Sequence, residues 1–364
     1  MVATESVEEG AQRLEVVGKG DGAVQRDGEN VLAPSETEKK WEKVQDKNEI
    51  NPNLLTFPWD TSAPACDPAE SVQKSIYISP SPSSSKESDQ SEGDQTTVLE
   101  PVRDVFTLEG VLTPEECEFL RRRTDEIGYS FWDESEGAQS DFRSAWTIEV
   151  THQKLADAVW RRVRASVPSS IVIGDEESDP RWERELEGEW EAVGVNPVLL
   201  FARYRDGGHF GPHSDGCTVI DVNHRSLFPF LIYLNTPEEG GETAVLHNEQ
   251  RDVPIPKDAE GRYTAEEKFV YARVRAQEGR GLVFFHTQMH EGVPVAKGSE
   301  KYIIRTDIMY RRKVPILAAP KDKEAYALWQ EAQLMAEQGH AKEAAVLFRK
   351  CVKTSRDVAD FLGL

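Results

Sequence analysis

The 364-residue sequence has no long hydrophobic run of the kind that crosses a membrane. None of its apolar stretches approaches the roughly 20 consecutive residues that a membrane-spanning helix needs. Its first residues include several acids, where a secretory signal would need a basic start and an apolar block. We therefore expect a protein without a membrane span that is located inside the cell, in the cytoplasm or the nucleus.

Cysteine is scarce, and the four residues of this type are widely scattered: Cys66, Cys117, Cys217 and Cys351. Structural zinc sites and small disulfide-rich domains use cysteines at close, regular spacings. No such spacing occurs here, which argues against both classes. We expect reduced thiols, in agreement with a location inside the cell.

Basic residues are outnumbered, with 43 Lys and Arg against 65 Asp and Glu, which gives a formal net charge of -22. The sequence pI is about 4.9. A strongly acidic chain repels the phosphate backbone of nucleic acids. A nucleic acid is therefore not an expected partner, and a protein or peptide partner, especially a basic one, suits this charge better.

The chain divides by composition into three parts. Residues 1–103 are acidic and rich in Ser and Pro, and such a segment buries too little apolar surface to offset the entropy of ordering. We predict a disordered tail there, a folded domain over 104–312 and a helical hairpin over 320–361. In the hairpin, small and large apolar residues alternate in a pattern similar to one tetratricopeptide unit. One such unit cannot bury its own face, so it is expected to contact the folded domain or another protein.

The folded part begins with helix signals and continues with strand signals. Thr113-Pro-Glu-Glu offers an N-cap, a proline at the first helical position and a capping-box glutamate, and a second amphipathic helix follows Thr151. The segment 174–192 is acidic and is expected to be an exposed insertion. Short β-rich runs then follow at spacings that suit a sandwich: 198–204, 228–234, 243–246, 269–274, 282–286 and 302–310. We predict an α+β protein with a mainly β core.

Three side chains form a candidate metal site. His213 and Asp215 are two residues apart, so on an extended segment they leave the same face of the chain. His290 follows a predicted strand and can complete the set from a facing strand. Two imidazoles and one carboxylate suit non-haem Fe(II) oxygenases, because they leave coordination positions open. A structural zinc site would instead close its four positions, usually with thiolates.

Three sequence blocks around these residues resemble the Fe(II)/2-oxoglutarate dioxygenase domain of the prolyl 4-hydroxylase type. They begin at Tyr204-Arg-Asp-Gly-Gly-His, at Leu231-Ile-Tyr-Leu-Asn and at His290-Glu-Gly-Val-Pro. The resemblance covers about residues 104–312 and implies a double-stranded β-helix, or jelly roll, with supporting helices at its N-terminal side. It implies that His213, Asp215 and His290 bind Fe(II).

The same resemblance implies a binding site for 2-oxoglutarate. Lys301 is the closest match to the basic residue that binds its far carboxylate, and Arg305, four residues on and on the same strand face, is the alternative. Tyr204, Tyr233 and Thr243 match positions beside the cosubstrate, and Arg225 matches a basic pocket position more loosely. Without the resemblance, the two tyrosines would be interpreted as aromatic core residues of a sandwich, and Lys301 as a solvated strand residue.

The implied activity is hydroxylation of an unactivated C–H bond, with release of succinate and CO2. The favoured target is a prolyl residue of a protein; Fe(II), 2-oxoglutarate and O2 are the expected cofactors, and ascorbate is a further candidate. Two alternatives stay open. One is a dioxygenase that acts on another side chain or on a small molecule, and the other is a non-catalytic jelly-roll adaptor with a vestigial metal site.

Overall fold

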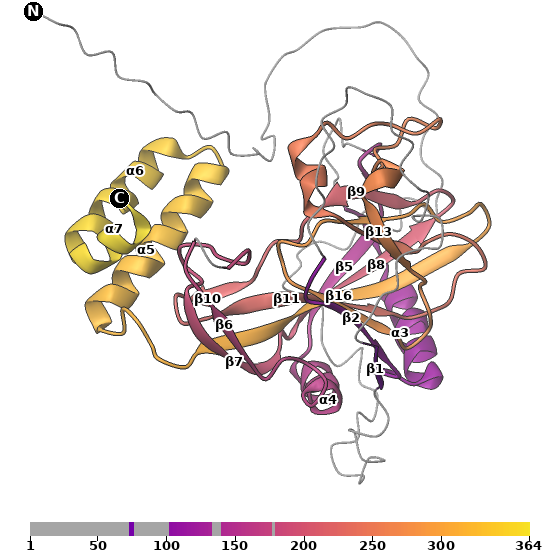
Figure 1. Ribbon diagram of the computed structural model, residues 1–364, viewed down its shortest axis with the longest axis horizontal. Coiled ribbons are helices and arrows are strands. Elements are labelled where there is room, and N and C mark those ends of the chain that lie inside the picture. Colours follow the sequence, from indigo (N-terminus) through magenta and orange to yellow (C-terminus); the bar gives the residue numbers. More distant parts are fainter. Residues whose placement is uncertain (1–72, 76–101, 133–139, 177–178) are drawn as a thin grey trace, which may run out of the picture. The chain divides into compact units, whose positions relative to one another are not determined.

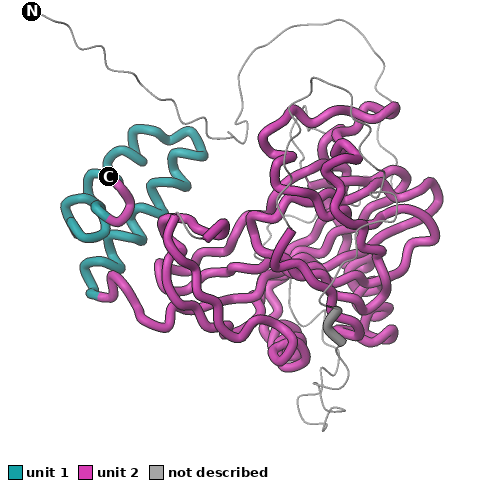
Figure 2. The backbone as a smooth tube through the Cα atoms, in the orientation of Figure 1, with its two compact units in different colours: residues 1–34, 319–360, 364 teal, residues 35–318, 361–363 magenta. Residues whose placement is uncertain are grey.

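A computed structural model describes residues 73–75, 102–132, 140–176 and 179–364. Among these, residues 73–318 with 361–363 form one compact unit, and residues 319–360 with Leu364 form another (Figure 2). The predicted disordered tail lies outside the described residues, apart from 73–75, 102 and 103. We describe each unit by itself.

The larger unit contains two β-sheets in which all strand pairs between described residues are antiparallel (Figure 1). The eleven-stranded sheet has a main path of β1 (Gln73–Ser75), β2 (Val105–Glu109), β14 (Gly281–Phe284), β11 (His224–Tyr233), β16 (Glu300–Arg312), β8 (Val198–Arg205), β5 (Trp146–Thr151) and β3 (Ser130–Phe131). Off this path, β10 (Val219–Asp221) pairs with β11, β7 (Gly188–Val195) with β16, and β6 (Ser170–Ile173) with β7. The five-stranded sheet runs β13 (Val270–Val274), β12 (Thr243–Leu246), β15 (His290–Gly292), β9 (His209–His213) and β4 (Arg143–Ser144).

A buried apolar cluster joins the two sheets. It combines Ala202, Leu231 and Ile303 of the large sheet with Val245 and Val274 of the small one. Because side chains alternate between the faces of a strand, the neighbouring residues of the large sheet point to its other face. The two sheets therefore face each other as a sandwich with its own core, which confirms the predicted jelly-roll architecture.

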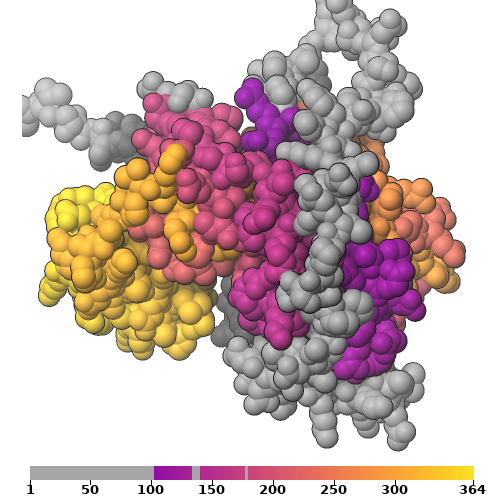
Figure 3. Space-filling view, turned by 90° about the horizontal axis from the view of Figure 1, so that it is seen from below, coloured from indigo at the N-terminus to yellow at the C-terminus, as the bar shows by residue number. Residues whose placement is uncertain are grey.

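Two helices cover the other face of the large sheet, α3 (Pro114–Ile127) and α4 (Gln153–Val163). Leu120 and Val159 from these helices pack in one buried cluster with Phe201 and Ile304 of the sheet. The surface seen in Figure 3 carries the purple atoms of α3 and the magenta atoms of α4. The predicted start of α3 is confirmed, because Thr113 and Glu116 form a complete capping box.

The six predicted strands are all present, with ends shifted by a few residues, but the prediction for 174–192 is wrong in part. Residues 188–192 belong to β7, which pairs with β16 and β6. Trp190 is fully buried, and its indole N–H donates to the carbonyl oxygen of Leu186 at 2.7 Å. Glu189 and Glu191 flank Trp190 in β7 and point to the opposite face of the strand. Their charges made the segment look exposed in the sequence.

The smaller unit is helical. It contains α5 (Pro320–Glu337) and α6 (Ala341–Thr354), and a short α7 (Arg356–Leu362) begins within it. Ala332, Ala344 and Cys351 of these helices are buried, in line with the small apolar residues of the predicted pattern. The similarity to a tetratricopeptide unit and the expected partner of the hairpin stay predictions. No described helix combines the length and the apolar character that crossing a membrane would require.

Candidate active site

The two sheets bring the three predicted metal ligands together. His213 ends β9 and His290 begins β15, and these paired strands place the two residues directly opposite each other. Asp215 follows two residues after β9. One ligand atom from each residue lies within 4.8 Å of the other two, and no second cluster of this kind occurs among the described residues. The distances are 3.7 Å from Nε2 of His213 to Oδ1 of Asp215 and 3.9 Å from Nε2 of His290 to Oδ2.

Both histidines present a nitrogen lone pair to this centre. Nδ1 of His213 lies 2.7 Å from the carbonyl oxygen of Gly211, and Nδ1 of His290 lies 3.1 Å from that of Gln288. Because a carbonyl oxygen only accepts, the Nδ1–H groups are the donors and each Nε2 is left as a potential metal ligand. Burial lowers the pKa of His213 to about 3 and also lowers the pKa of His290. Both rings are therefore neutral, as ligation requires.

Aromatic neighbours fix the orientation of the two rings. The phenyl ring of Phe210 stacks on the imidazole of His213, with 3.5 Å between centroids and 16° between planes. Phe284 contacts His290 at a centroid distance of 4.4 Å. Such packing limits the rotation of both imidazoles, so that their Nε2 atoms keep facing Asp215.

The donor set fits a divalent cation. Oδ2 of Asp215 is buried without a hydrogen bond, and its nearest cation, Nε of Arg305, lies 3.6 Å away. The atom thus keeps lone pairs that a metal ion can occupy. Cys217 lines the same cavity but is not part of the cluster. Two neutral imidazoles and a carboxylate without a thiolate are the set that suits Fe(II) with open positions rather than structural zinc.

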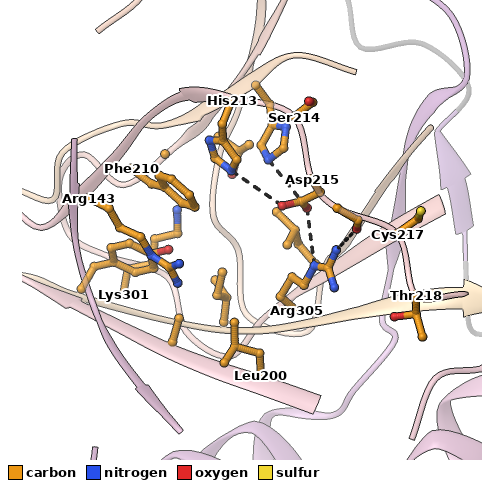
Figure 4. A pocket seen from close by; sticks show the side chains of 18 residues that line it. Arg143, Leu200, Phe210, His213, Ser214, Asp215, Cys217, Thr218, Lys301 and Arg305 are labelled. Atoms are coloured by element: carbon orange, nitrogen blue, oxygen red, sulfur yellow. Dashed lines mark hydrogen bonds and ion pairs between the residues drawn. The ribbon is translucent and has the colours of Figure 1, made fainter. Parts of the chain in front are cut away.

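The cluster lies in the wall of a cavity of about 500 Å³ (Figure 4). Lys301 and Arg305 of β16 line this cavity, together with Tyr204 of β8 and Thr243 of β12. Tyr233 is fully buried, and its hydroxyl lies 2.7 Å from Oγ1 of Thr243, to which it donates. The structure thus brings the predicted cosubstrate residues to the same cavity as the candidate metal centre.

Lys301 is a buried cation without a counterion. Its side chain is 3% exposed, and it has no hydrogen bond or ion pair with any described residue. Its Nζ lies 5.3 Å from the ring centroid of Tyr204 and 5.7 Å from that of Tyr233. Burial lowers the pKa of Lys301 to about 8, although the charge of Glu242 acts in the opposite direction. The aromatic faces stabilise the ammonium by cation–π attraction.

Arg305 is placed differently, because its guanidinium is already engaged (Figure 4). Its Nε lies 3.6 Å from Oδ2 of Asp215, and its Nη1 lies 3.2 Å from Oδ2 of Asp307. Its Nη2 donates to the carbonyl oxygen of Gly216 at 2.6 Å. Arg305 therefore faces the candidate ligand Asp215 with all three of its nitrogens in use.

Arg225 does not line the cavity, so the looser prediction for this residue is wrong. Its Nη2 donates to Sγ of Cys217 at 2.8 Å, and its Nη1 lies 3.6 Å from Glu185. His286 is buried outside the cluster, and burial lowers its pKa to about 4. His286 stands four residues before His290, a spacing that two metal ligands on a helix would have, but it is not part of the cluster, and its burial fits a packing role.

Arg143 of β4 also lines the cavity, although no pattern in the sequence predicted it. Its guanidinium carbon lies 4.6 Å from the ring centroid of Phe210 and 5.2 Å from that of Trp132. Its Nε is buried without a hydrogen-bond partner. The pairing of β4 with β9 brings Arg143 to the cavity, and no local pattern in the sequence announces that pairing.

Comparisons with known proteins agree with this geometry. Residues 199–306 match the 2OG-Fe(II) oxygenase superfamily. This segment contains all three members of the metal cluster, as well as Lys301 and Arg305. No curated protein sequence matches the chain significantly.

Several solved structures are similar to part of the chain. A viral collagen prolyl hydroxylase from Paramecium Bursaria Chlorella virus-1, in complex with 2OG, has a TM-score of 0.35 and 17% identity, over 57% of this chain and 97% of its own. A prolyl-4-hydroxylase from Pseudomonas putida has a TM-score of 0.33 and 14% identity, over 58% and 93%. A prolyl hydroxylase from Trichoplax adhaerens, in complex with a hypoxia inducible factor peptide fragment, has a TM-score of 0.35 and 15% identity, over 57% and 83%.

The superfamily match and the His-Asp-His cluster agree on the chemistry of the site. Fe(II) and 2-oxoglutarate are the metal and the cosubstrate that the superfamily implies, and the donor set described above fits this metal. The superfamily match thus falls on the residues that form the candidate metal centre and the cosubstrate pocket. The chain is a 2-oxoglutarate- and iron-dependent dioxygenase.

Proposed function

We propose that His213, Asp215 and His290 bind Fe(II), and that the enzyme hydroxylates a prolyl residue of a protein with release of succinate and CO2. The observation that carries the proposal is one cavity that combines two features. It holds a metal-ligand set with both Nε2 atoms directed at Asp215, and it is lined by a buried lysine without a counterion.

Lys301 binds the far carboxylate of 2-oxoglutarate in this proposal, and Arg305 does not. A buried ammonium without a partner is unfavourable unless a ligand supplies the opposite charge. Arg305 already interacts with two carboxylates and a carbonyl oxygen. A new anion would have to displace these partners, whereas Lys301 is available as it stands.

The remaining pocket residues orient the cosubstrate and exclude water. Fe(II), when bound, supplies coordination positions at which 2-oxoglutarate and dioxygen react. Tyr204 and Tyr233 hold the ammonium of Lys301 by their ring faces, and Thr243, which accepts from Tyr233, presents its side chain to the cavity. The apolar side chains of Leu200, Leu231 and Ile303 complete the lining and lower the local dielectric constant, which strengthens the pairing of Lys301 with a carboxylate.

A prolyl substrate is supported by the sequence blocks that resemble prolyl 4-hydroxylases and by the lining of the cavity. Phe210, Leu200 and the aliphatic part of the wall suit the apolar ring of a proline. A protein or peptide also suits an acidic chain better than a nucleic acid. A role for ascorbate and a location inside the cell stay predictions.

The test is succinate release by the full-length protein with Fe(II), 2-oxoglutarate and proline-containing peptides, followed by mass spectrometry of the peptides. We expect a gain of one oxygen atom on proline, and no succinate release from His213→Ala. Succinate release without peptide oxidation would reject these peptides as substrates and favour another side chain or a small molecule. Absence of both turnover and metal binding in the unaltered protein would reject the enzyme and favour the adaptor.

A further inference from the structure

We infer that Arg305, together with Asp307, is a positioning residue for the metal ligand Asp215 and takes no part in binding 2-oxoglutarate. The inference rests on the proposed role of Asp215 as a metal ligand. It assigns a function to the ion pairs of Arg305 with Asp215 and Asp307, which have no role in the proposed binding of 2-oxoglutarate.

Asp215 needs such support because no strand holds it. The strand β9 ends at His213, and residues 214–218 have no regular secondary structure. Ladder hydrogen bonds therefore fix the backbone of the histidine but not that of the carboxylate. A metal centre binds tightly only if all its ligands are held near their coordinating positions.

Arg305 and Asp307 hold this segment at two points. Arg305 contacts Oδ2 of Asp215 and donates to the carbonyl oxygen of Gly216. Oδ2 of Asp307 accepts from Oγ1 of Thr218 at 2.9 Å. Both anchoring residues belong to the long strand β16, which pairs with three other strands along its length. The segment after the candidate ligand is thereby tied to the most extensively paired strand of the large sheet.

Asp307 in turn fixes Arg305. It is fully buried, it lies 3.2 Å from Nη1 of Arg305, and it accepts from Nδ2 of Asn196 at 3.2 Å. The planar guanidinium can reach Asp215, Gly216 and Asp307 at once because its donors are arranged in a rigid fork. A lysine at this position would keep the charge but could not keep all three contacts. The conservative variant therefore separates positioning from charge.

The experiment measures Mn(II) binding by the full-length protein, from the EPR signal of free Mn(II), without oxygen chemistry. We expect Arg305→Gln to weaken Mn(II) binding by about 10- to 100-fold, the range found when a residue that supports a metal ligand is removed. Arg305→Lys should weaken Mn(II) binding less than Arg305→Gln does, because a lysine keeps the charge but loses part of the contacts. Arg203→Gln is the matched control, because Arg203 also pairs with two carboxylates of the same unit, Asp125 and Glu300, outside the cavity. Its affinity for Mn(II) should be unchanged.

A second readout separates the two roles of the cations. At saturating Mn(II), Arg305→Gln and Arg305→Lys should bind 2-oxoglutarate with the affinity of the unaltered protein in a calorimetric titration. Unchanged Mn(II) affinity in both variants would overturn the inference and leave the proposed function intact. A loss of 2-oxoglutarate affinity at saturating metal would also overturn it, and would make Arg305 the cosubstrate residue. If the unaltered protein binds no Mn(II), the proposed function itself fails.

Discussion

Lys301 and Arg305 lie four residues apart on one strand and line one cavity, yet they occupy opposite electrostatic situations. The lysine is almost fully buried and has no counterion, whereas the arginine is bound to two carboxylates and a carbonyl oxygen. Equal position in the sequence pattern therefore does not mean equal chemistry. Which cation can receive an anionic ligand depends on the partners that each already has.

The contrast between the two cations also distinguishes the two ends of the cavity. Burial of an uncompensated ammonium costs free energy, so its presence in a cavity points to a ligand that compensates it. A compensated guanidinium can instead hold a protein group in place. The cavity thus has one end prepared for a carboxylate of the cosubstrate and another end prepared for a metal.

The largest effect is expected from removing the metal centre that both cations serve. His290→Ala should abolish turnover and stoichiometric metal binding, because it leaves two ligands where three converge. Metal content after Fe(II) loading, measured by atomic absorption, checks this expectation. His286→Gln is the control, since His286 lies outside the cluster and should keep its metal. Full metal content in His290→Ala would show that His290 is not a metal ligand, and it would contradict the metal centre on which the comparison of Lys301 with Arg305 depends.

The next effect breaks the contrast between the two cations. Lys301→Gln should weaken 2-oxoglutarate binding by about 2–5 kcal/mol, the usual cost of removing one partner of a buried charge pair. Lys301→Arg should recover part of the loss. Titration of 2-oxoglutarate into the Mn(II)-loaded protein measures both. A larger loss in Arg305→Gln than in Lys301→Gln would reverse the assignment.

The pH dependence sharpens the same contrast. Burial lowers the pKa of Lys301 to about 8, so its amine is charged below this pH and loses its charge as the pH rises. The value of kcat/KM for 2-oxoglutarate reports the free enzyme, and it should fall by about tenfold per pH unit above this pKa. Lys301→Arg should remove the decline, because arginine stays charged. A profile that is flat from pH 7 to pH 9.5 in the unaltered enzyme would contradict the role of Lys301.

The smallest effect is expected from the group behind the lysine. Tyr233→Phe removes the hydroxyl that donates to Thr243 but keeps the ring face near Lys301. The expected loss of 2-oxoglutarate affinity is about 0.5–1.5 kcal/mol, the typical net contribution of one hydrogen bond. The KM for 2-oxoglutarate measures it, with Tyr302→Phe as a control outside the cavity. A loss equal to that of Lys301→Gln would mean that the hydroxyl, and not the ammonium, is the main contact.

The sequence predicted the parts of the fold that local patterns encode. The capping box at Thr113, the strand at 243–246 and the three clustered residues of the metal site follow from spacing and from motif blocks. It also named Lys301 and Arg305 as alternatives. The sequence ranked Lys301 first but gave no reason to reject Arg305, because the contact of Arg305 with Asp307 and with the segment after β9 depends on how strands distant in the sequence pair.

The same cause accounts for the remaining errors. Arg143 reaches the cavity only because the two-residue strand β4 pairs with β9. Trp190 is buried because β7 pairs with both β6 and β16. Arg225 was matched to the pocket by its distance along the chain, and it points instead to Cys217 and Glu185. Each of these positions follows from long-range strand pairing, which a pattern of neighbouring residues does not contain.

The central claim is that 2-oxoglutarate binds through a metal held by His213, Asp215 and His290. Its most direct test is a calorimetric titration of 2-oxoglutarate into the full-length protein without oxygen, with and without Mn(II). We predict binding of one molecule per chain that requires Mn(II) and is lost in His213→Ala. Equal binding in the absence of the metal, or Mn(II)-dependent binding that survives in His213→Ala, would contradict the account.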